Sequence, residues 1–351
     1  MANKKVGVLG ATGAVGQRII HMLRDHPWYD VTSLHAGSSA GKVYGDAVTW
    51  LLPDGVPDKV KDLTIKTTTP ETADVDLVFS ALPSGVAINV EPKFAKAGIP
   101  VVSNASAYRM YDDVPLIVPE VNPDHIKLIK TQKKKRGWDG FIATDPNCST
   151  INFVLALKPI YDLYTPTKIH ITTMQAISGA GYPGLPSLDI LENVIPYIGG
   201  EEEKMETEPQ KIMGKLENGQ ISDAKLSISA SCNRVPSIDG HLETIYLEAE
   251  ETIDLDEVKS AISGFTSRAQ ELKLPTSPTK PLILREEPNR PQTRLDRMAG
   301  SVPGMAVSVG RVRHGLDSKS LRFVCIGHNT IRGAAGGAIS LAELLSAEGY
   351  I

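Results

Sequence analysis

The feature that most constrains the fold is a glycine-rich turn between a short apolar strand and a helix at the start of the chain. Lys4 to Leu9 predicts a buried strand, and Gly13 to Arg24 predicts a helix. Glycines in the Gly-x-x-Gly-x-x-Gly segment from 10 to 16 allow a tight turn and let the backbone approach a pyrophosphate at the helix N-terminus. The alternative is an ordinary turn, but the position between strand and helix favours dinucleotide binding. The residues expected at the cofactor are Gly10, Thr12, Gly13, Ala14 and Val15.

The end of the second predicted strand, Val31 to Ala36, indicates which dinucleotide binds. A chain that binds NAD normally carries an acidic residue there for the ribose hydroxyls. This chain continues as Gly37-Ser38-Ser39-Ala40-Gly41-Lys42, without an acid. The hydroxyls of Ser38 and Ser39, backbone amides and a lysine suit a 2′-phosphate, so we expect NADP. Lys42 alone is equally compatible with a solvated loop.

Strands and helices alternate over roughly the first 147 residues. Further strands are expected at 75–81 and 100–103, with a helix at 87–97. This alternation predicts a Rossmann-like α/β domain, with a parallel sheet covered on both faces.

After residue 147 the expected strands become longer and alternate apolar with polar residues, which predicts an α+β domain with a mixed sheet. The last expected helix, 330–348, has an apolar face that needs a partner, so we expect it to return to the first domain. The predicted domains are therefore 1–147, 148–329 and 330–351. Expected strands are 168–176, 225–230, 241–250, 306–312 and 320–327, expected helices are 185–194 and 256–271, and the Pro-rich stretch 274–292 is expected to be an extended arm or loop.

Composition excludes several classes of protein. A chain of 351 residues suits two domains, and 41% hydrophobic with 22% charged residues is typical of a globular protein. A net charge of −4 predicts binding neither to nucleic acid nor to a membrane surface, and no apolar run is long enough to span a bilayer. The N-terminus runs into a strand, so no signal peptide is expected. Three distant cysteines without metal-ligand spacing predict no metal site, no disulfide framework and a reducing, cytoplasmic setting.

One cysteine stands at a second turn from strand to helix. Gly140 to Ala143 predicts a strand, and Cys148 in Asp145-Pro146-Asn147-Cys148-Ser149-Thr150 directly precedes an apolar helical pattern. A helix N-terminus stabilises negative charge, whereas a free cysteine with a pKa of about 8.5 is mostly thiol at neutral pH. We therefore expect Cys148 to be a nucleophile whose thiolate is stabilised.

Residues later in the chain are candidates to assist this nucleophile. His241 follows Gly240 and opens an apolar strand, which makes it a candidate base. Nucleophile, base and cofactor turn together suggest a reductase that works through a thioester. Taken alone, a histidine such as His241 is more often a surface or structural residue than a catalyst, and Arg234 could equally be an ion-pair partner. The acidic run from Glu201 is most simply a solvated helix start, where acids suit the helix dipole.

Taken together, the motifs resemble an aspartate-β-semialdehyde dehydrogenase of the archaeal and fungal branch. They follow the order of that family and span nearly the whole chain. The matching elements are Gly10 to Gly16, Ser103 to Ser106 with Arg109, Val118 to Asn122, Asp145 to Thr150, Gln175 with Ser178 to Gly181, Glu201 with Lys204, Arg234 to Pro236 with Gly240-His241, His328 to Thr330, and Arg332 to Gly336.

The resemblance implies reductive dephosphorylation of L-aspartyl-4-phosphate by NADPH to L-aspartate-4-semialdehyde, in the biosynthesis of lysine, threonine, methionine and isoleucine. Cys148 would be the nucleophile that forms a thioester, which accepts a hydride better than a carboxylate does. His241 would take the thiol proton and later protonate the collapsing hemithioacetal. Gln175 would orient the acyl group, and backbone amides near Cys148 would stabilise the tetrahedral oxygen. Because these residues come from both domains, the site is expected in a cleft between them.

The resemblance also implies the binding residues. Arg234 would hold the substrate α-carboxylate, because a guanidinium matches a carboxylate with two parallel hydrogen bonds. Glu201 would pair with the substrate ammonium. The leaving phosphate would be held by Arg109, Asn147 and Lys204. The nicotinamide end of NADP would contact Ser178, Gly179, Asn329 and Thr330.

Three alternatives differ in what they need. A malonyl-CoA reductase of the same structural family would keep Cys148, His241 and the NADP turn, but it would bind a CoA ester. An N-acetyl-γ-glutamyl-phosphate reductase usually has Gly, not Asn147, before its cysteine, and it would not need Glu201 for a free ammonium. A non-enzymatic NADP-binding regulator would be expected to lose the nucleophile or the base, and both are present.

Assembly is likewise implied by the resemblance alone. It implies a homodimer or homotetramer with the sheet of the second domain at the interface, so we expect 148–329 to be both the catalytic and the dimerisation domain. The expected partners are a small-molecule substrate and further copies of the chain, with no nucleic acid and no membrane.

Overall fold

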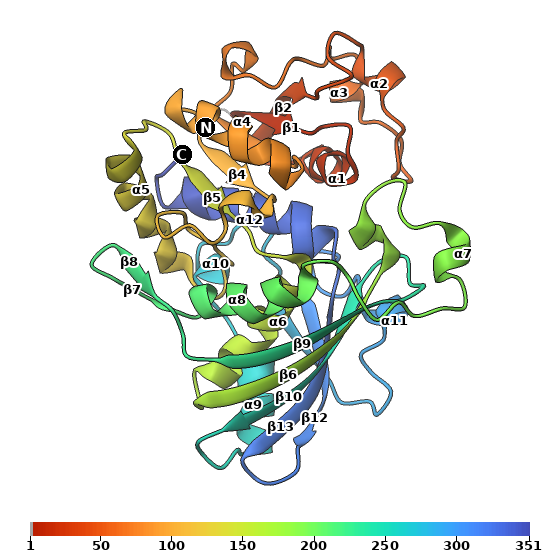
Figure 1. The fold of residues 1–351 in the computed structure, drawn as a ribbon, viewed down its shortest axis with the longest axis vertical. Coiled ribbons are helices and arrows are strands. Elements are labelled where there is room, and N and C mark those ends of the chain that lie inside the picture. The colour runs from red at the N-terminus through yellow and green to blue at the C-terminus, as the bar shows by residue number, and fades with distance from the viewer. Residues whose placement is uncertain (1–2) are drawn as a thin grey trace.

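The computed structural model describes residues 3–351, which form two large sheets surrounded by helices, and one small hairpin (Figure 1). The first sheet has five parallel strands in the order β2-β1-β3-β4-β5. This arrangement confirms the expected Rossmann-like sheet. The strands are β1 (Lys4–Leu9), β2 (Tyr29–His35), β3 (Leu77–Ser80), β4 (Val101–Ser103) and β5 (Ile142–Thr144).

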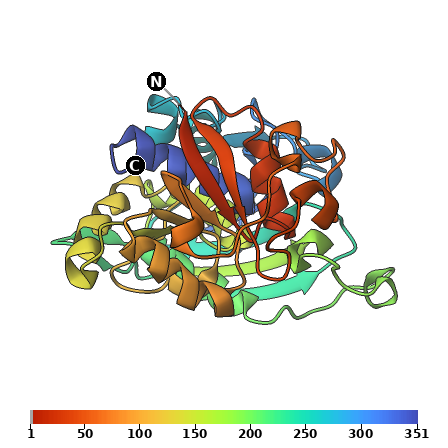
Figure 2. The same ribbon diagram turned by 90° about the horizontal axis from the view of Figure 1, so that it is seen from above.

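Helices cover both faces of this sheet, as the nearly continuous apolar strands require. Alternate strand residues such as Val8 and Phe79 pack with α1 (Ala14–Met22) and α12 (Gly336–Ala347). Their neighbours on the other face, such as Val78, pack with α4 (Ser84–Lys96). Seen from above, α12 and α4 lie on opposite sides of the strands (Figure 2). The C-terminal helix therefore packs in the core of the first domain.

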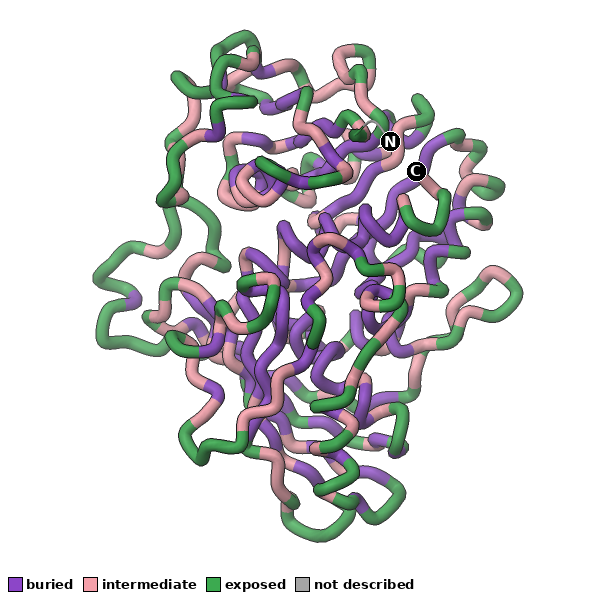
Figure 3. The backbone as a smooth tube through the Cα atoms, turned by 180° about the vertical axis from the view of Figure 1, so that it is seen from behind, coloured by how far each residue is buried: buried purple, intermediate pink, exposed green. Residues whose placement is uncertain are grey.

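The second sheet is mixed, as expected, with six strands in the order β11-β12-β13-β10-β6-β9. Helices α6 (Cys148–Tyr161), α8 (Glu201–Ile212) and α9 (Leu255–Gly264) join its apolar face in one core. Purple buried backbone runs through both sheets and green exposed backbone lies in the outer loops (Figure 3). The strands are β6 (Pro166–Gln175), β9 (Ser227–Arg234), β10 (His241–Ala249), β11 (Leu282–Arg285), β12 (Val307–His314) and β13 (Ser320–Gly327).

Three expected elements differ in the structure. The Pro-rich stretch is not wholly an arm, because β11 pairs with β12 at the sheet edge directly after Pro281, where a proline is tolerated. The expected helix 256–271 is two helices, α9 and α10 (Arg268–Glu271), because Ser267 and Gln270 form a capping box that starts a new helix. The segment 185–194 holds only the single turn α7 (Ser187–Ile190).

The remaining elements are short. The hairpin of β7 (Lys215–Glu217) and β8 (Gln220–Ser222) was not expected from the sequence. The other helices and turns are α2 (Tyr44–Ala47), α3 (Asp58–Lys61), α5 (Leu128–Arg136), α11 (Thr293–Asp296), η1 (Pro70–Thr72), η2 (Ser106–Tyr108), η3 (Pro123–Lys127), η4 (Ile177–Ala180) and η5 (Ile331–Ala335). None of the helices over residues 3–351 has the length and apolar character needed to span a bilayer.

The turn η5 joins the two halves of the molecule. It is a π-helical turn that precedes α12 and packs against both α1 and α6, the two helices whose N-termini carry the glycine turn and Cys148. Arg332 of η5 makes two hydrogen bonds to the carboxylate of Glu120, at 2.8 and 2.6 Å, and both side chains are fully buried. Two motifs far apart in the sequence therefore meet in one buried ion pair.

Candidate active site

Cys148 lies at the first position of α6, directly after the sheet edge where β5 ends. Asn147 is the N-cap residue, and its Oδ1 accepts hydrogen bonds from the backbone N–H groups of Ser149 and Thr150, at 2.9 and 3.3 Å. This cap explains why the helix begins at the cysteine. The Asn147 side chain therefore has a structural role in addition to any contact with a ligand.

The groups around the Cys148 thiol act on its pKa in opposite directions. Burial, followed by the negative charge of Glu201, raises the pKa of Cys148, while the charges of Arg109, Arg234 and Lys204 act in the opposite direction. Desolvation therefore opposes the stabilisation that a helix N-terminus gives to a thiolate. Gly333 of η5 packs on Cys148, and a Cβ at Gly333 would come within 2.8 Å of the Cys148 Cβ.

Glu201 opens α8 and links three of the predicted site residues. Its Oε2 accepts hydrogen bonds from Asn147 Nδ2 at 2.8 Å and Gln175 Nε2 at 3.3 Å, and its Oε1 pairs with Lys204 Nζ at 2.8 Å. Burial alone would raise the pKa of Glu201, but Lys204 and these hydrogen bonds hold it below its usual value. Glu201 is 9% exposed, so the acidic run does not simply mark a solvated helix start.

Ala176, at the end of β6, holds His241 and Arg234 through its main chain. Its N–H donates to His241 Nδ1 at 3.0 Å, and its carbonyl accepts from an Arg234 terminal nitrogen at 2.7 Å. Gly179 lies against the same two side chains, because a Cβ there would come within 2.7 Å of the guanidinium and 3.3 Å of the imidazole. The strand ends and the η4 turn thus bring Gln175, Gly179, Arg234 and His241 together.

The environment of His241 fixes its protonation. The side chain is fully buried, and burial followed by the charge of Arg234 lowers its pKa to about 3. Because Nδ1 accepts a backbone hydrogen bond, the neutral ring carries its proton on Nε2. Nε2 is buried and makes no hydrogen bond within the protein. His241 therefore offers a free N–H donor at neutral pH.

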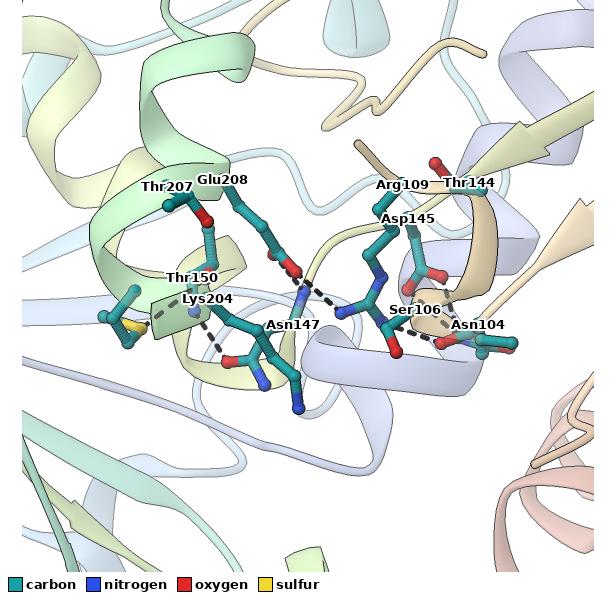
Figure 4. A network of polar contacts seen from close by, with 12 residues as sticks. Asn104, Ser106, Arg109, Thr144, Asp145, Asn147, Thr150, Lys204, Thr207 and Glu208 are labelled. Atoms are coloured by element: carbon teal, nitrogen blue, oxygen red, sulfur yellow. Dashed lines mark hydrogen bonds and ion pairs between the residues drawn. The ribbon is translucent and has the colours of Figure 1, made fainter. Parts of the chain in front are cut away.

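Arg109 is connected to the cysteine turn by Glu208, a residue that sequence reasoning missed. Glu208 Oε1 accepts from an Arg109 terminal nitrogen at 2.9 Å, and Oε2 accepts from the Asn147 N–H at 2.7 Å (Figure 4). The other terminal nitrogen of Arg109 donates to the Asn104 carbonyl at 2.7 Å. A signal was present, since Glu201, Lys204 and Glu208 recur at the spacing of one helix face.

The glycine turn lies at the end of β1 with the geometry that a pyrophosphate needs. Gly10 has a φ of +79°, and a Cβ there would come within 2.7 Å of the Ala81 carbonyl oxygen, so only glycine fits. Gly13 is the N-cap of α1, and no side chain caps that helix. Thr12, Ala14 and Val15 are partly exposed there, so the helix N-terminus is open to an anion.

Other predicted cofactor residues lie in two separate places. Ser38 is exposed and Ser39 partly exposed in the turn after β2. Asn329 joins the strand ends, because its Nδ2 donates to Ser178 Oγ and its Oδ1 accepts from Gly240 N–H, each at 2.8 Å. Thr330 follows it and opens η5. Within residues 3–351, no group of three His, Cys, Asp or Glu side chains could hold a metal ion.

Comparison with known families gives two matches along the chain. The semialdehyde dehydrogenase NAD-binding domain matches residues 5–129, and the semialdehyde dehydrogenase dimerisation domain matches residues 157–332. Cys148 lies between the two matched segments, and His241 lies within the second.

Individual relatives match over their full length. An aspartate-semialdehyde dehydrogenase of Archaeoglobus fulgidus is 54% identical over 347 residues, with 99% of each chain covered. A malonyl-CoA reductase (NADP) of Metallosphaera sedula is 42% identical over 99% of this chain and 98% of its own. The crystal structure of the Candida albicans aspartate-semialdehyde dehydrogenase with NADP superposes with a TM-score of 0.91 at 40% identity, covering both chains completely.

Proposed function

Because the chain belongs to the semialdehyde dehydrogenase family, as its motifs predicted, we propose that it reduces L-aspartyl-4-phosphate to L-aspartate-4-semialdehyde with NADPH and releases phosphate. This reaction serves the synthesis of lysine, threonine, methionine and isoleucine. The observation that carries the proposal is the charge pattern at Cys148, on which three cations and one carboxylate act. That pattern complements a substrate with a carboxylate, a phosphate and an ammonium.

Binding of the substrate follows from this pattern. Arg234 suits the α-carboxylate, because only one of its donors is used by the Ala176 carbonyl. Glu201 suits the ammonium, and Arg109 with Lys204 suits the phosphate. Asn147 would contribute less to phosphate than expected, because its side chain already caps α6 and bonds Glu201. Gln175, which also bonds Glu201, would orient the acyl group.

The first chemical step is attack of the Cys148 sulfur on the acyl carbon. The C–S bond forms, the bond from carbon to the phosphate oxygen breaks, and its electron pair leaves on phosphate. Burial favours the thiol form of Cys148, and a thiol must lose its proton during this step. Because His241 Nδ1 accepts the Ala176 N–H, the neutral ring carries its proton on Nε2, and we propose that His241 acts as a donor in place of the base expected from the sequence. We assign the thiol proton to the departing phosphate.

The second step converts the thioester to the aldehyde. Bound NADPH supplies the hydride, and the glycine turn with Ser178, Gly179, Asn329 and Thr330 would hold it. As the carbonyl oxygen gains charge, His241 Nε2–H can donate to it, as an oxyanion-hole donor does. The C–S bond then breaks, its electrons return to sulfur, and the thiolate regains a proton from the medium.

Two related functions fit the site less well. A malonyl-CoA reductase would keep Cys148 and His241, but malonyl-CoA has no ammonium to pair with Glu201. An N-acetylated amino-acid phosphate also lacks that ammonium. The Glu201 carboxylate, which Asn147 holds by a hydrogen bond, therefore favours a substrate with a free ammonium, which is a free amino acid.

The reverse reaction tests the proposal. Supply L-aspartate-4-semialdehyde, NADP and phosphate, and follow NADPH absorbance with and without phosphate, beside malonate semialdehyde with CoA. We expect phosphate-dependent turnover with the amino-acid aldehyde, at most one equivalent of NADPH per site without phosphate, and loss of turnover with intact NADP binding in Cys148→Ser. CoA-dependent turnover with malonate semialdehyde alone would move the assignment to the malonyl-CoA reductases.

For the assembly we propose a homodimer formed through the second sheet, with a tetramer as the larger possibility. One face of that sheet packs on helices, while the other presents the exposed Thr172 and Thr244 and the partly exposed Tyr246. The matched family segment is also named as a dimerisation domain. Sedimentation analysis of the purified chain measures the assembly directly, and a monomer at micromolar concentration would reject it.

We propose that the protein works in the cytoplasm. Cys148, Cys232 and Cys325 are all free, and the mechanism needs a reduced thiol. A reducing compartment keeps such thiols available.

A further inference from the structure

We infer that Glu208 is a positioning residue that fixes the phosphate-binding arginine relative to the nucleophile. The inference deepens the proposed function and rests on it. Glu208 itself touches neither substrate nor cofactor in the proposed reaction. Its two carboxylate oxygens instead hold two groups that the acylation step needs at a set separation.

The first contact is with the turn that carries the nucleophile. Glu208 Oε2 accepts the backbone N–H of Asn147 at 2.7 Å (Figure 4). Asn147 directly precedes Cys148 and caps the helix that Cys148 opens. The carboxylate therefore restrains the backbone on which the sulfur is placed.

The second contact is with Arg109. Glu208 Oε1 pairs with one terminal nitrogen at 2.9 Å, and the side chains are 2% and 8% exposed. The Asn104 carbonyl holds the other terminal nitrogen at 2.7 Å, while Nε makes no hydrogen bond within the protein. Arg109 is thus held at two points and keeps donors for an anion, since a guanidinium has five N–H groups.

Helix α8 restrains the main chain of Arg109 as well. Lys211, three residues after Glu208, donates from its ammonium to the carbonyls of Arg109, Tyr111 and Val114 at 2.6 to 2.7 Å. The same helix carries Glu201 and Lys204 at its N-terminus. One rigid helix therefore sets the relative positions of the substrate-binding charges, the arginine and the cysteine turn.

This arrangement makes the two half-reactions unequally sensitive to Glu208. Oxidation of the aldehyde to the thioester needs the sulfur and NADP, but no phosphate. Attack of phosphate on the thioester needs Arg109 at a fixed distance from the sulfur. A carboxylate that couples Arg109 to the cysteine turn should therefore matter most for the phosphate step.

The test uses Glu208→Gln, which keeps the shape of the side chain but replaces one acceptor by an N–H donor. Glu203→Gln on the exposed face of the same helix is the matched control. Both full-length enzymes are assayed with L-aspartate-4-semialdehyde and NADP, with and without inorganic phosphate. We expect Glu208→Gln to raise the KM for phosphate at least about 10-fold and to lower phosphate-dependent kcat about 10- to 100-fold, the size of a small misplacement in an active site. The single-turnover yield of NADPH without phosphate should stay near one per site.

A double-mutant cycle distinguishes loss of the Glu208–Arg109 contact from a general folding defect of the Glu208→Gln variant. If Glu208 acts through Arg109, its effect on the KM for phosphate should largely disappear in an Arg109→Lys background. An unchanged KM for phosphate in Glu208→Gln would overturn the inference, as would equal loss of the single-turnover yield and of steady turnover. Absence of phosphate-dependent turnover in the unchanged enzyme would instead reject the proposed function.

Discussion

At the scale of single residues, one backbone hydrogen bond decides which nitrogen of His241 carries the proton of the neutral ring. The Ala176 N–H occupies His241 Nδ1, so the proton of the neutral ring stands on Nε2. Burial and Arg234 lower the pKa of the ring to about 3, so a second proton is not held at neutral pH. In the proposed mechanism His241 therefore acts as a hydrogen-bond donor in the reduction step, and the thiol proton goes to another acceptor.

Replacements at His241 separate a donor from a base. His241→Ala should lower kcat about 10²- to 10³-fold, the usual effect of losing an oxyanion donor. His241→Gln keeps an N–H donor and should recover about 10-fold of that loss. Steady-state kcat measured from pH 5 to 8 should show no His241 titration near 6.5 in the unchanged enzyme. The opposite result would show that His241 is a base. In that case the unchanged enzyme would lose kcat below a pH near 6.5, this acid limb would be absent in both variants, and His241→Gln would be as inactive as His241→Ala.

At the scale of elements, we expect the turn after β2 to govern which dinucleotide binds. It carries Ser38 and Ser39 at the surface and no carboxylate, in a position where the ribose of the adenosine half is recognised. The presence of NADP in a full-length structural relative agrees with this composition.

An acid placed in this turn should change the preference. Ser38→Glu would repel a 2′-phosphate and accept hydrogen bonds from ribose hydroxyls, so kcat/KM for NADP should fall roughly 10- to 100-fold while kcat/KM for NAD rises. Ser260→Glu, on the exposed side of α9, adds the same charge elsewhere and should change neither value. A Ser38→Glu enzyme with unaltered NADP kinetics would place the 2′-phosphate outside this turn.

Helix α4 carries a buried carboxyl that makes stability depend on pH. Glu91 accepts a hydrogen bond from Ser103 Oγ through Oε1, and its Oε2 makes none within the protein. Burial raises the pKa of Glu91 to about 7 from its usual 4.5. A raised pKa means that the folded protein binds the proton more tightly, so this stabilisation is complete below pH 4.5 and is lost as pH rises through 7.

Glu91→Gln should remove this dependence. The difference in unfolding free energy between the two proteins should shift in favour of Gln by up to about 3 kcal/mol from pH 5 to 8. Thermal unfolding of both proteins across that range measures the difference, in which titrations common to both cancel. Parallel curves for the two proteins would show that Glu91 keeps an ordinary pKa in the fold.

Helices, strands and site residues could be predicted from the sequence where the burial pattern was simple. They were missed where burial depends on contacts with distant parts of the chain. The parallel strands could be predicted because they are apolar runs. Cys148 was found because it stands at a turn from strand to helix. Glu208 was missed because a charged helix face is normally solvated, whereas α8 buries that face against the cysteine turn. Strand β11 was missed because the surrounding prolines predicted an extended loop. Its pairing depends on β12, which lies further along the chain.

At the scale of the whole molecule, a segment near the C-terminus packs against Cys148. The turn η5 lies between the helix of the glycine turn and the helix of Cys148, and its Gly333 touches the cysteine. The turn is tied to the first half of the chain by Arg332 and Glu120. Both motifs were visible in the sequence, but their pairing was not, because 212 positions separate them.

Breaking this ion pair tests how the two halves are held. Glu120→Gln leaves the Arg332 charge buried without a counter-charge, and loss of one partner of a buried pair usually costs about 3–5 kcal/mol, so the melting temperature should drop clearly. Replacing both, as Glu120→Leu with Arg332→Met, removes the charge and should recover much of that stability. Calorimetry of the three proteins measures this, and turnover of the double variant adds a second readout. Recovered stability with lost activity would mean that the pair also sets how η5 packs on Cys148. If Glu120→Gln has the same melting temperature as the unchanged protein, the pair contributes nothing to joining the halves, and other contacts, such as the apolar packing of α12 on the first sheet, hold them.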